Sequence, residues 1–159
     1  MKIFVRSVLV ATFLLFIAGK ANAQTPEGIA TVYVYKTDHR ATLGRFTVPV
    51  LLDGREIARL NQNRYLIAKI PAGRHVLTSK DEKSVALTID LKAGETYYVR
   101  ISTDGGLIKL TPPEFTLVSM WEGRSFVADM KQIQPKDITD ESIVQKHDSK
   151  VPEKSIQND

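Results

Sequence analysis

The stretch FTVPVLLDGREIARLNQNRYLIAKIPAGRHVLT, residues 46–78, indicates the fold of this chain. Short apolar runs alternate with polar residues here, and two turn signals, Asp53-Gly54 and Pro71-Ala72-Gly73, separate them. Glycine adopts positive φ without a steric penalty, and proline presets φ for a turn. A third signal, Lys92-Ala93-Gly94-Glu95, follows further along the chain. This pattern is typical of consecutive β-hairpins, whose expected turn residues are Asp53, Gly54, Pro71, Gly73 and Gly94.

Period-two alternation, the spacing of side chains on one face of a strand, extends over most of the chain. The expected strands are 29–35, 46–52, 56–60, 65–70, 75–79, 85–91, 96–102, 107–110 and 115–121. Pro49 cannot donate a ladder hydrogen bond, so we expect its strand at a sheet edge or at a bulge. Within 96–102, we expect Tyr97, Val99 and Ile101 to point inward. Regular turns between such strands predict an all-β antiparallel sandwich of about seven strands.

The first 23 residues have the features of a secretory signal peptide. Lys2 and Arg6 precede an uncharged apolar stretch at 8–19, and Ala21-Asn22-Ala23 forms a small-residue cleavage site before Gln24. The apolar stretch is shorter than the roughly 20 residues that a membrane-spanning helix requires. We therefore expect cleavage at Gln24, no transmembrane segment afterwards, and a periplasmic or secreted location. An uncleaved membrane anchor is the alternative.

The chain contains no cysteine, which excludes disulfides and lipid attachment through an N-terminal cysteine. Its formal net charge is +4. Three of the 22 Lys and Arg residues (Lys2, Arg6, Lys20) lie in the leader, which leaves 19 basic and 18 acidic residues in the mature chain. Because nucleic-acid binding favours clustered Lys and Arg, no nucleic-acid partner is expected.

The composition changes after residue 131. The segment 132–159 lacks aromatic residues, mixes charges of both signs and contains Pro135 and Pro152. Its few apolar residues cannot by themselves compensate for the entropy lost on ordering a chain. We interpret residues 24–131 as the β-sandwich domain, with one or two helical turns at 125–131. Residues 132–159 are interpreted as a flexible polar tail, with a transient helix near 140–146.

Four segments carry a resemblance to a known family: ATVYVY at 30–35, LLDG at 51–54, IPAGRH at 70–75 and AGETYYVR at 93–100. Their order and spacing resemble the bacterial family called domain of unknown function 2846, over roughly residues 28–119. The resemblance implies a small exported protein, often a lipoprotein, with a prealbumin-like or carboxypeptidase-regulatory-like sandwich and no enzymatic activity or cofactor. This chain differs in lacking the lipobox cysteine. It also has Asn63-Arg64 before Tyr65, where the resemblance predicts a glycine.

Two histidines are candidates for chemistry. His75 follows the Pro71–Gly73 turn, and we interpret it as a structural turn residue, with a ligand or a base as the alternative. His39 stands beside Asp38, an arrangement in which the carboxylate can orient a catalytic or metal-binding imidazole. No second His or Cys lies at ligand spacing, and no G-x-S-x-G motif is present. We therefore predict no catalytic residue, no cofactor and no metal site.

Tyr98, Arg100 and Trp121 form the predicted interaction surface, because Tyr, Arg and Trp dominate binding hot spots. The alternative is that a second layer covers Tyr98 and that Trp121 belongs to the core. The prediction is an exported, non-catalytic binding or interaction module of the bacterial cell envelope, with an unidentified envelope protein or glycan as partner. The alternative is a small periplasmic hydrolase or carbohydrate-active domain that uses loop carboxylates and His39.

Overall fold

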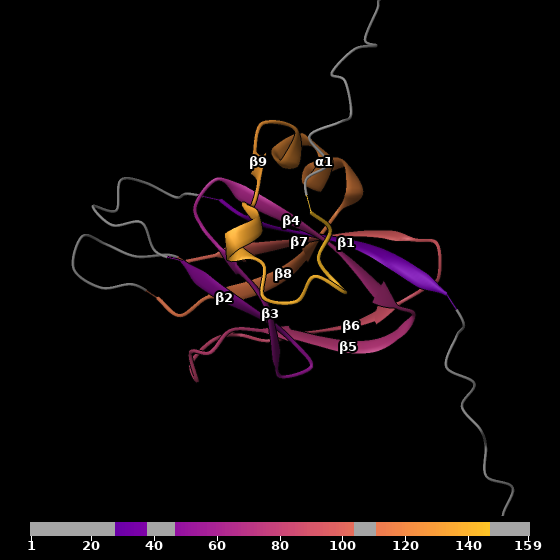
Figure 1. Cartoon of the computed structure of the whole chain (residues 1–159), viewed down its shortest axis with the longest axis horizontal. Helices are drawn as coiled ribbons and strands as arrows, with labels where there is room; N and C mark the ends of the chain where they lie inside the picture. Colours follow the sequence, from indigo (N-terminus) through magenta and orange to yellow (C-terminus); the bar gives the residue numbers. More distant parts are fainter. Residues whose placement is uncertain (1–27, 38–46, 104–110, 147–159) are drawn as a thin grey trace, which may run out of the picture.

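The computed structural model of the chain describes residues 28–37, 47–103 and 111–146. These residues form two β-sheets packed face to face, one helix and a C-terminal segment (Figure 1). The first sheet contains β8 (Glu114–Val118), β7 (Thr96–Ser102), β1 (Ile29–Lys36), β4 (Arg64–Pro71) and β9 (Lys131–Gln132), in that order. The second contains β3 (Arg55–Leu60), β2 (Val48–Leu52), β5 (Gly73–Thr78) and β6 (Leu87–Leu91), in that order. The predicted all-β sandwich is confirmed.

The core lies between the sheets and takes alternate residues from each strand. In β1, Ala30, Val32 and Val34 are fully buried, whereas Thr31 and Tyr33 lie on the opposite face and are half-buried. In β7, Val99 and Ile101 are buried as expected, and Tyr97 packs against the core at its edge. Further fully buried side chains of the core are Val50, Ile57, Leu60, Leu66, Ile70 and Leu77. The inward face that alternation predicts for 96–102 is therefore the core face of β7.

Strand β1 occupies the centre of its sheet and has two different neighbours. It pairs antiparallel with β4, from Ile29 opposite Pro71 to Lys36 opposite Arg64. It pairs parallel with β7, from Thr31 opposite Thr96 to Lys36 opposite Ile101. Among the described strand pairs, the pairing is thus antiparallel except for this pair and the two-residue β4–β9 pair, and an isolated bridge between Val85 and Glu114 is also parallel. A parallel pair requires a long crossover, and here the connection from β1 to β7 contains the four strands of the other sheet and β4 of the same sheet.

The β2–β3 hairpin turns at Asp53 and Gly54, which have φ of 50° and 83°. Positive φ at both central residues is the requirement of a type I′ turn, which matches the twist of a two-residue hairpin. The turn before β4 also contains a residue with positive φ, in this case an asparagine. Asn63 has φ of 51°, a conformation that asparagine tolerates better than most residues other than glycine. Asn63 therefore replaces the glycine that the family resemblance predicts near this position.

Pro49 lies in β2, which is an interior strand of its sheet and not the edge strand that its proline suggested. However, β2 pairs with β5 only through Leu51 and Leu52. Its first half pairs with β3 alone, and the register shifts between Val50 and Leu51. Pro49 thus lies where β2 has a neighbouring strand on one side only, next to the register shift. Its missing N–H therefore leaves no hydrogen bond of the sheet unmade on the open side.

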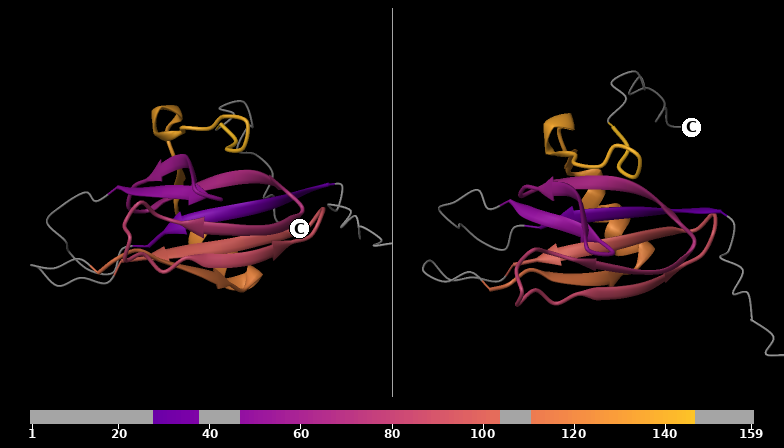
Figure 2. Two further views of the ribbon diagram at one scale, coloured as in Figure 1. Left: turned by 90° about the horizontal axis from the view of Figure 1, so that it is seen from below. Right: turned by 60° about the horizontal axis from the view of Figure 1, so that its bottom comes forward.

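The C-terminal segment, residues 131–146, joins the edges of the two sheets along one side of the sandwich (Figure 2). It includes β9 and the 3-10 helix η1 (Pro135–Asp137). The Ile133 amide donates to the Tyr65 carbonyl of β4 at 2.9 Å, and the Asp140 amide donates to the Ile57 carbonyl of β3 at 3.0 Å. Ile133 and Val144 are buried in the core. The interpretation of 132–159 as a flexible tail is therefore wrong for residues 132–146, while 147–159 lie outside the described residues.

Asp140 fixes this segment to β3 through its carboxylate. The side chain is almost fully buried and accepts hydrogen bonds from the Ser142 hydroxyl at 2.5 Å and the Ser142 amide at 3.1 Å. Its second oxygen lies 3.1 Å from the Arg55 guanidinium. The hydrogen bond from the Ser142 hydroxyl, aided by the Arg55 charge, lowers the pKa of the Asp140 carboxyl despite its burial. The local turn at 140–142 thus stabilises the charged form of this aspartate.

The expected strand at 115–121 is shorter than predicted, because β8 ends at Val118 and helix α1 (Met120–Ala128) follows. The helical turns expected at 125–131 therefore begin five residues earlier than predicted. The expected leader at 1–23 and the short strand at 107–110 lie outside the described residues. Within the described ranges, no helix is long and apolar enough to cross a membrane.

Candidate functional site

Helix α1 begins with an N-cap whose residue pattern is visible in the sequence. Ser119 is the N-cap, and its hydroxyl accepts a hydrogen bond from the Glu122 amide at 3.2 Å. The Ser119-Met120-Trp121-Glu122 run matches the S-x-x-E capping pattern, which is a local signal for a helix start inside the expected strand at 115–121. The acidic Glu122 in the first turn also complements the positive end of the helix dipole.

Gly123 allows α1 to lie directly on the outer face of the first sheet. A Cβ at this position would lie 2.2 Å from the Tyr98 Cγ, so no other residue fits without movement. The Tyr98 ring in turn stacks on Tyr33, with 4.9 Å between ring centroids and 14° between ring planes. Phe126 of the helix stacks on Tyr35, with centroids 5.8 Å apart. Helix α1 is therefore docked on an aromatic face formed by β1 and β7.

An ion pair and a buried hydroxyl complete this contact. The Arg100 guanidinium donates to the Glu122 carboxylate at 2.8 Å, with both side chains about one-third exposed. Burial raises the pKa of the Tyr35 hydroxyl, and the nearby Glu122 charge raises it further. Burial likewise raises the pKa of Tyr98. Within the described ranges, the buried Tyr35 hydroxyl has no hydrogen-bond partner.

The outer side of α1 presents apolar side chains to solvent. Trp121 is 83% exposed and Met120 is 55% exposed, and Leu117 at the end of β8 is also exposed. Met120, Trp121, Arg124 and Ser125 line an open groove of about 600 Å³. We refer to Leu117, Met120, Trp121, Arg124 and Ser125 as the α1 surface. A tryptophan exposed to this extent is uncommon, because most of its surface is apolar.

The structure brings the three predicted interaction residues together but divides their roles. Tyr98 is 7% exposed beneath Gly123, so it supports the helix and is not available to a partner. Arg100 of β7 forms an ion pair with Glu122 of α1. Trp121 lies on the solvent side and is not a core residue. Met120 and Arg124 lie beside Trp121 on this surface, and the sequence pattern does not indicate them because it predicts a strand at 115–121.

His75 connects two of the predicted turns. Its Nδ1 lies 2.7 Å from the Asp53 Oδ2, and its Nε2 lies 2.9 Å from the Pro71 carbonyl oxygen. The other Asp53 oxygen accepts from the Val76 amide at 2.8 Å. Both ring nitrogens thus face oxygen atoms of the protein itself, so neither nitrogen is directed at a substrate. This geometry favours the structural interpretation of His75.

Replacing His75 with phenylalanine is expected to lower the free energy of unfolding by about 1–2 kcal/mol, because the ring's polar contacts with Asp53 and the Pro71 carbonyl disappear and these oxygen atoms remain. Urea denaturation at neutral pH measures this difference. Arg74→Gln, at the exposed neighbouring position, serves as the control and is expected to leave stability unchanged. Equal stability of the two variants would contradict a structural role for His75.

Among the other candidates for chemistry, the histidine–aspartate pair lies outside the described residues, and two described glutamates have partners of their own. His39 and Asp38 lie outside the described residues. Glu95 accepts a hydrogen bond from the Tyr97 hydroxyl at 2.7 Å, and Glu122 is paired with Arg100. Among the described side chains, no group of three or more His, Cys, Asp or Glu residues could hold a metal ion.

The fold defines this chain as a two-sheet β-sandwich protein with a helix docked on one outer face. The family model "Protein of unknown function (DUF2846)" matches residues 26–111, more than half of the chain. The chain belongs to this family, as the resemblance in its sequence predicted. Comparisons with curated proteins and with solved structures found no match. Helix α1 and the C-terminal segment follow the matched residues, so the family match gives no information about them.

Proposed function

We propose that this protein is an exported, non-catalytic binding module of the bacterial cell envelope, and that it binds a protein partner through the α1 surface. The observation that carries the proposal is the exposure of Trp121, 83% of which faces solvent on a helix that is itself firmly docked. The leader-like sequence at 1–23 supports the envelope location. The absence of enzymatic activity is part of the proposal.

The docking of α1 supports a binding role because it holds the side chains in place before a partner arrives. Gly123 against Tyr98, and Arg100 against Glu122, fix the helix relative to the sheet. A partner therefore has little conformational entropy to remove, and pre-organisation of this kind favours affinity. Tryptophan and arginine are the residue types most enriched among the side chains that dominate binding energy.

The chemistry of the α1 surface indicates what the partner offers. Met120 and Trp121 require an apolar pocket, and Arg124 forms no ion pair within the part of the chain that the structure describes. A complementary surface therefore has a hydrophobic pocket for the indole and a carboxylate opposite Arg124. We commit to a protein surface of this type, with a lipid surface as the competing occupant.

The test is affinity capture from an envelope fraction, followed by calorimetry with the captured protein. Trp121→Ala is expected to weaken binding by about thirtyfold and Arg124→Glu by about tenfold, as for hot-spot residues. Val85→Ala removes an equally apolar, exposed side chain from a different surface and serves as the control, with no expected change. A captured protein that binds the unaltered chain and the three variants equally would overturn the proposal. So would Trp121-dependent binding to anionic lipid vesicles without any protein partner.

A further inference from the structure

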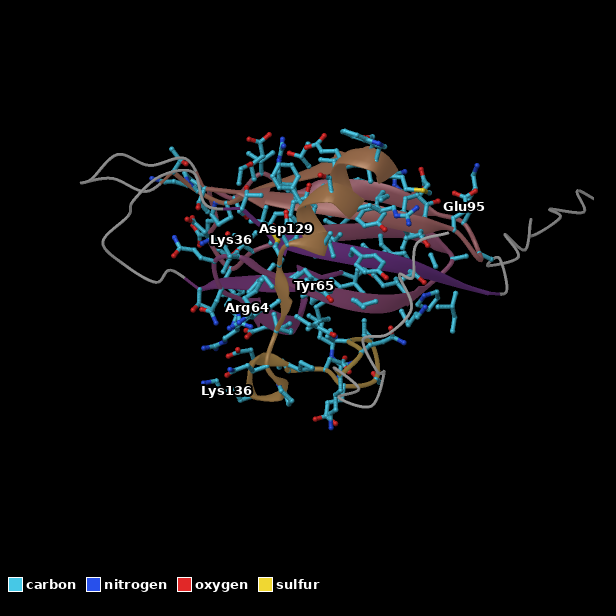
Figure 3. All side chains as sticks on the ribbon, turned by 90° about the horizontal axis from the view of Figure 1, so that it is seen from above. Lys36, Arg64, Tyr65, Glu95, Asp129 and Lys136 are labelled. Carbon is cyan, nitrogen blue, oxygen red and sulfur yellow. The ribbon has the colours of Figure 1, made fainter. Side chains whose placement is uncertain are left out.

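A cleft at the end of the sandwich is lined by polar side chains from two distant segments. Besides Gln62, the lining consists of Asn61 and Asn63 from the β3–β4 turn, Arg64 at the start of β4, and Gln134, Lys136 and Asp137 from η1 and the residue before it. The cleft has a volume of about 520 Å³. Ligand sites commonly have volumes of roughly 300–1,000 Å³. Figure 3 shows Arg64 and Lys136 at the same end of the molecule, extending from β4 and from η1. We refer to these six residues as the polar cleft.

Backbone hydrogen bonds hold both walls of the polar cleft in place. On one wall, the Asn63 amide donates to the Lys36 carbonyl at 3.1 Å. On the other, the Asp137 amide donates to the Gln134 carbonyl at 2.9 Å. Pairing of Arg64 and Tyr65 with β9 joins the two walls. The cleft is thus formed before a ligand enters, which reduces the entropy lost on binding.

The polar cleft offers more hydrogen-bond donors than acceptors. The Asn61 Oδ1 already accepts from the Thr47 hydroxyl at 2.6 Å, so the two N–H groups of its amide remain. Arg64 donates through one terminal nitrogen to the Gln132 carbonyl at 3.2 Å, and a guanidinium has five N–H groups in all. Lys136 adds an exposed ammonium group that forms no ion pair with any described residue. A ligand that fits is therefore rich in acceptor oxygens.

Charge narrows the class of ligand further. Arg64 and Lys136 are positive and Asp137 is negative, so the six residues carry one net positive charge. A carboxylate in the cleft repels a bare multivalent anion such as phosphate. The same carboxylate accepts hydrogen bonds from hydroxyl groups. A ligand with one carboxylate for the two cations, and several hydroxyls for the amides and Asp137, matches all six side chains.

We infer that the polar cleft binds an acidic sugar of the uronic-acid type. Arg64 and Lys136 bind the sugar carboxylate, while Asp137 and the amides of Asn61, Asn63 and Gln134 bind the hydroxyls. The site lies apart from the α1 surface in sequence and in composition. The inference therefore does not depend on the proposed function.

The test is an NMR titration of the full ¹⁵N-labelled chain with sodium glucuronate, glucose and inorganic phosphate in parallel. Glucuronate is expected to shift the amide signals of residues 61–64 and 134–137, with weaker binding as salt rises. Lys136→Gln is expected to weaken glucuronate binding by about tenfold. Lys131→Gln makes the same charge change at an exposed position outside the cleft, and it is expected to bind as the unaltered chain does.

The remaining outcomes each overturn the inference. Absence of glucuronate-dependent shifts at 61–64 and 134–137 excludes an acidic-sugar site. Equal binding of phosphate indicates a simple anion site, and equal binding of glucose indicates a neutral-sugar site. Equal weakening by Lys136→Gln and Lys131→Gln indicates attraction by overall charge alone.

Discussion

A chain shortened to end at Met130 is expected to lose at least about 3 kcal/mol of unfolding free energy, or to fail to fold. Shortening removes Ile133 and Val144 from the core, and removing one large buried aliphatic side chain already costs about 2–5 kcal/mol. It also removes the hydrogen bonds that the C-terminal segment makes with Ile57 of β3 and Tyr65 of β4. The expected result is a much lower urea midpoint, together with association through the uncovered strand edges. Urea denaturation and light scattering measure the two effects.

A chain that ends at Lys146 is the matched control for this experiment. It keeps every described contact of the C-terminal segment and is expected to unfold at the same urea concentration as the full chain. A flexible tail from residue 132 onward would instead make both shortened chains as stable as the full one. That outcome would contradict the packing of Ile133 and Val144.

Replacing Gly123 with valine is expected to displace α1 from the sheet and to cost about 2–3 kcal/mol of unfolding free energy. The new Cβ would lie 2.2 Å from the Tyr98 Cγ, and the Tyr98 ring cannot withdraw because it stacks on Tyr33. Glycine is a poor helix former, so most replacements would favour an isolated helix by a few tenths of a kcal/mol up to about 1 kcal/mol. The steric cost exceeds that gain. Urea denaturation gives the stability, and the near-ultraviolet circular dichroism of the tyrosines reports the displacement.

Ser125→Val is the control for the Gly123 variant, because it places the same β-branched residue on the exposed side of the same helix. It is expected to change stability by less than about 0.5 kcal/mol. If the two valine variants unfold alike, α1 does not depend on close contact between Gly123 and Tyr98. If only the Gly123 variant is destabilised, it is also expected to lose binding through the α1 surface, since Trp121 moves with the helix.

The strands and hairpin turns could be predicted from the sequence because their signals are local. Alternation at 29–35 predicts the strand that forms β1, and Asp53-Gly54 predicts the β2–β3 hairpin, without any knowledge of distant residues. The start of helix α1 could also be predicted from the sequence, since the Ser119–Glu122 cap is a local signal. The sequence pattern predicts a strand for its first residues because five of the seven residues at 115–121 are apolar, and short apolar runs do not distinguish a strand from a helix.

The C-terminal segment could not be predicted in this way. Ile133, Ile138, Ile143 and Val144 are too few and too far apart to form a core of their own. They become ordered because the edges of β3 and β4 already offer unpaired backbone groups and an uncovered apolar margin. The polar cleft has the same origin, because Arg64 and Lys136 approach each other only when this segment folds back.

The sequence by itself determined the strands, the turn residues and the membership of an uncharacterised family, because backbone conformation and side-chain alternation are properties of neighbouring residues. Tertiary structure alone decided which of Tyr98, Arg100 and Trp121 faces solvent. The contact between Gly123 and Tyr98 buries the tyrosine and leaves the tryptophan exposed on the opposite side of the helix. Exposure depends on what packs against a residue, and here the packing partners come from distant parts of the chain.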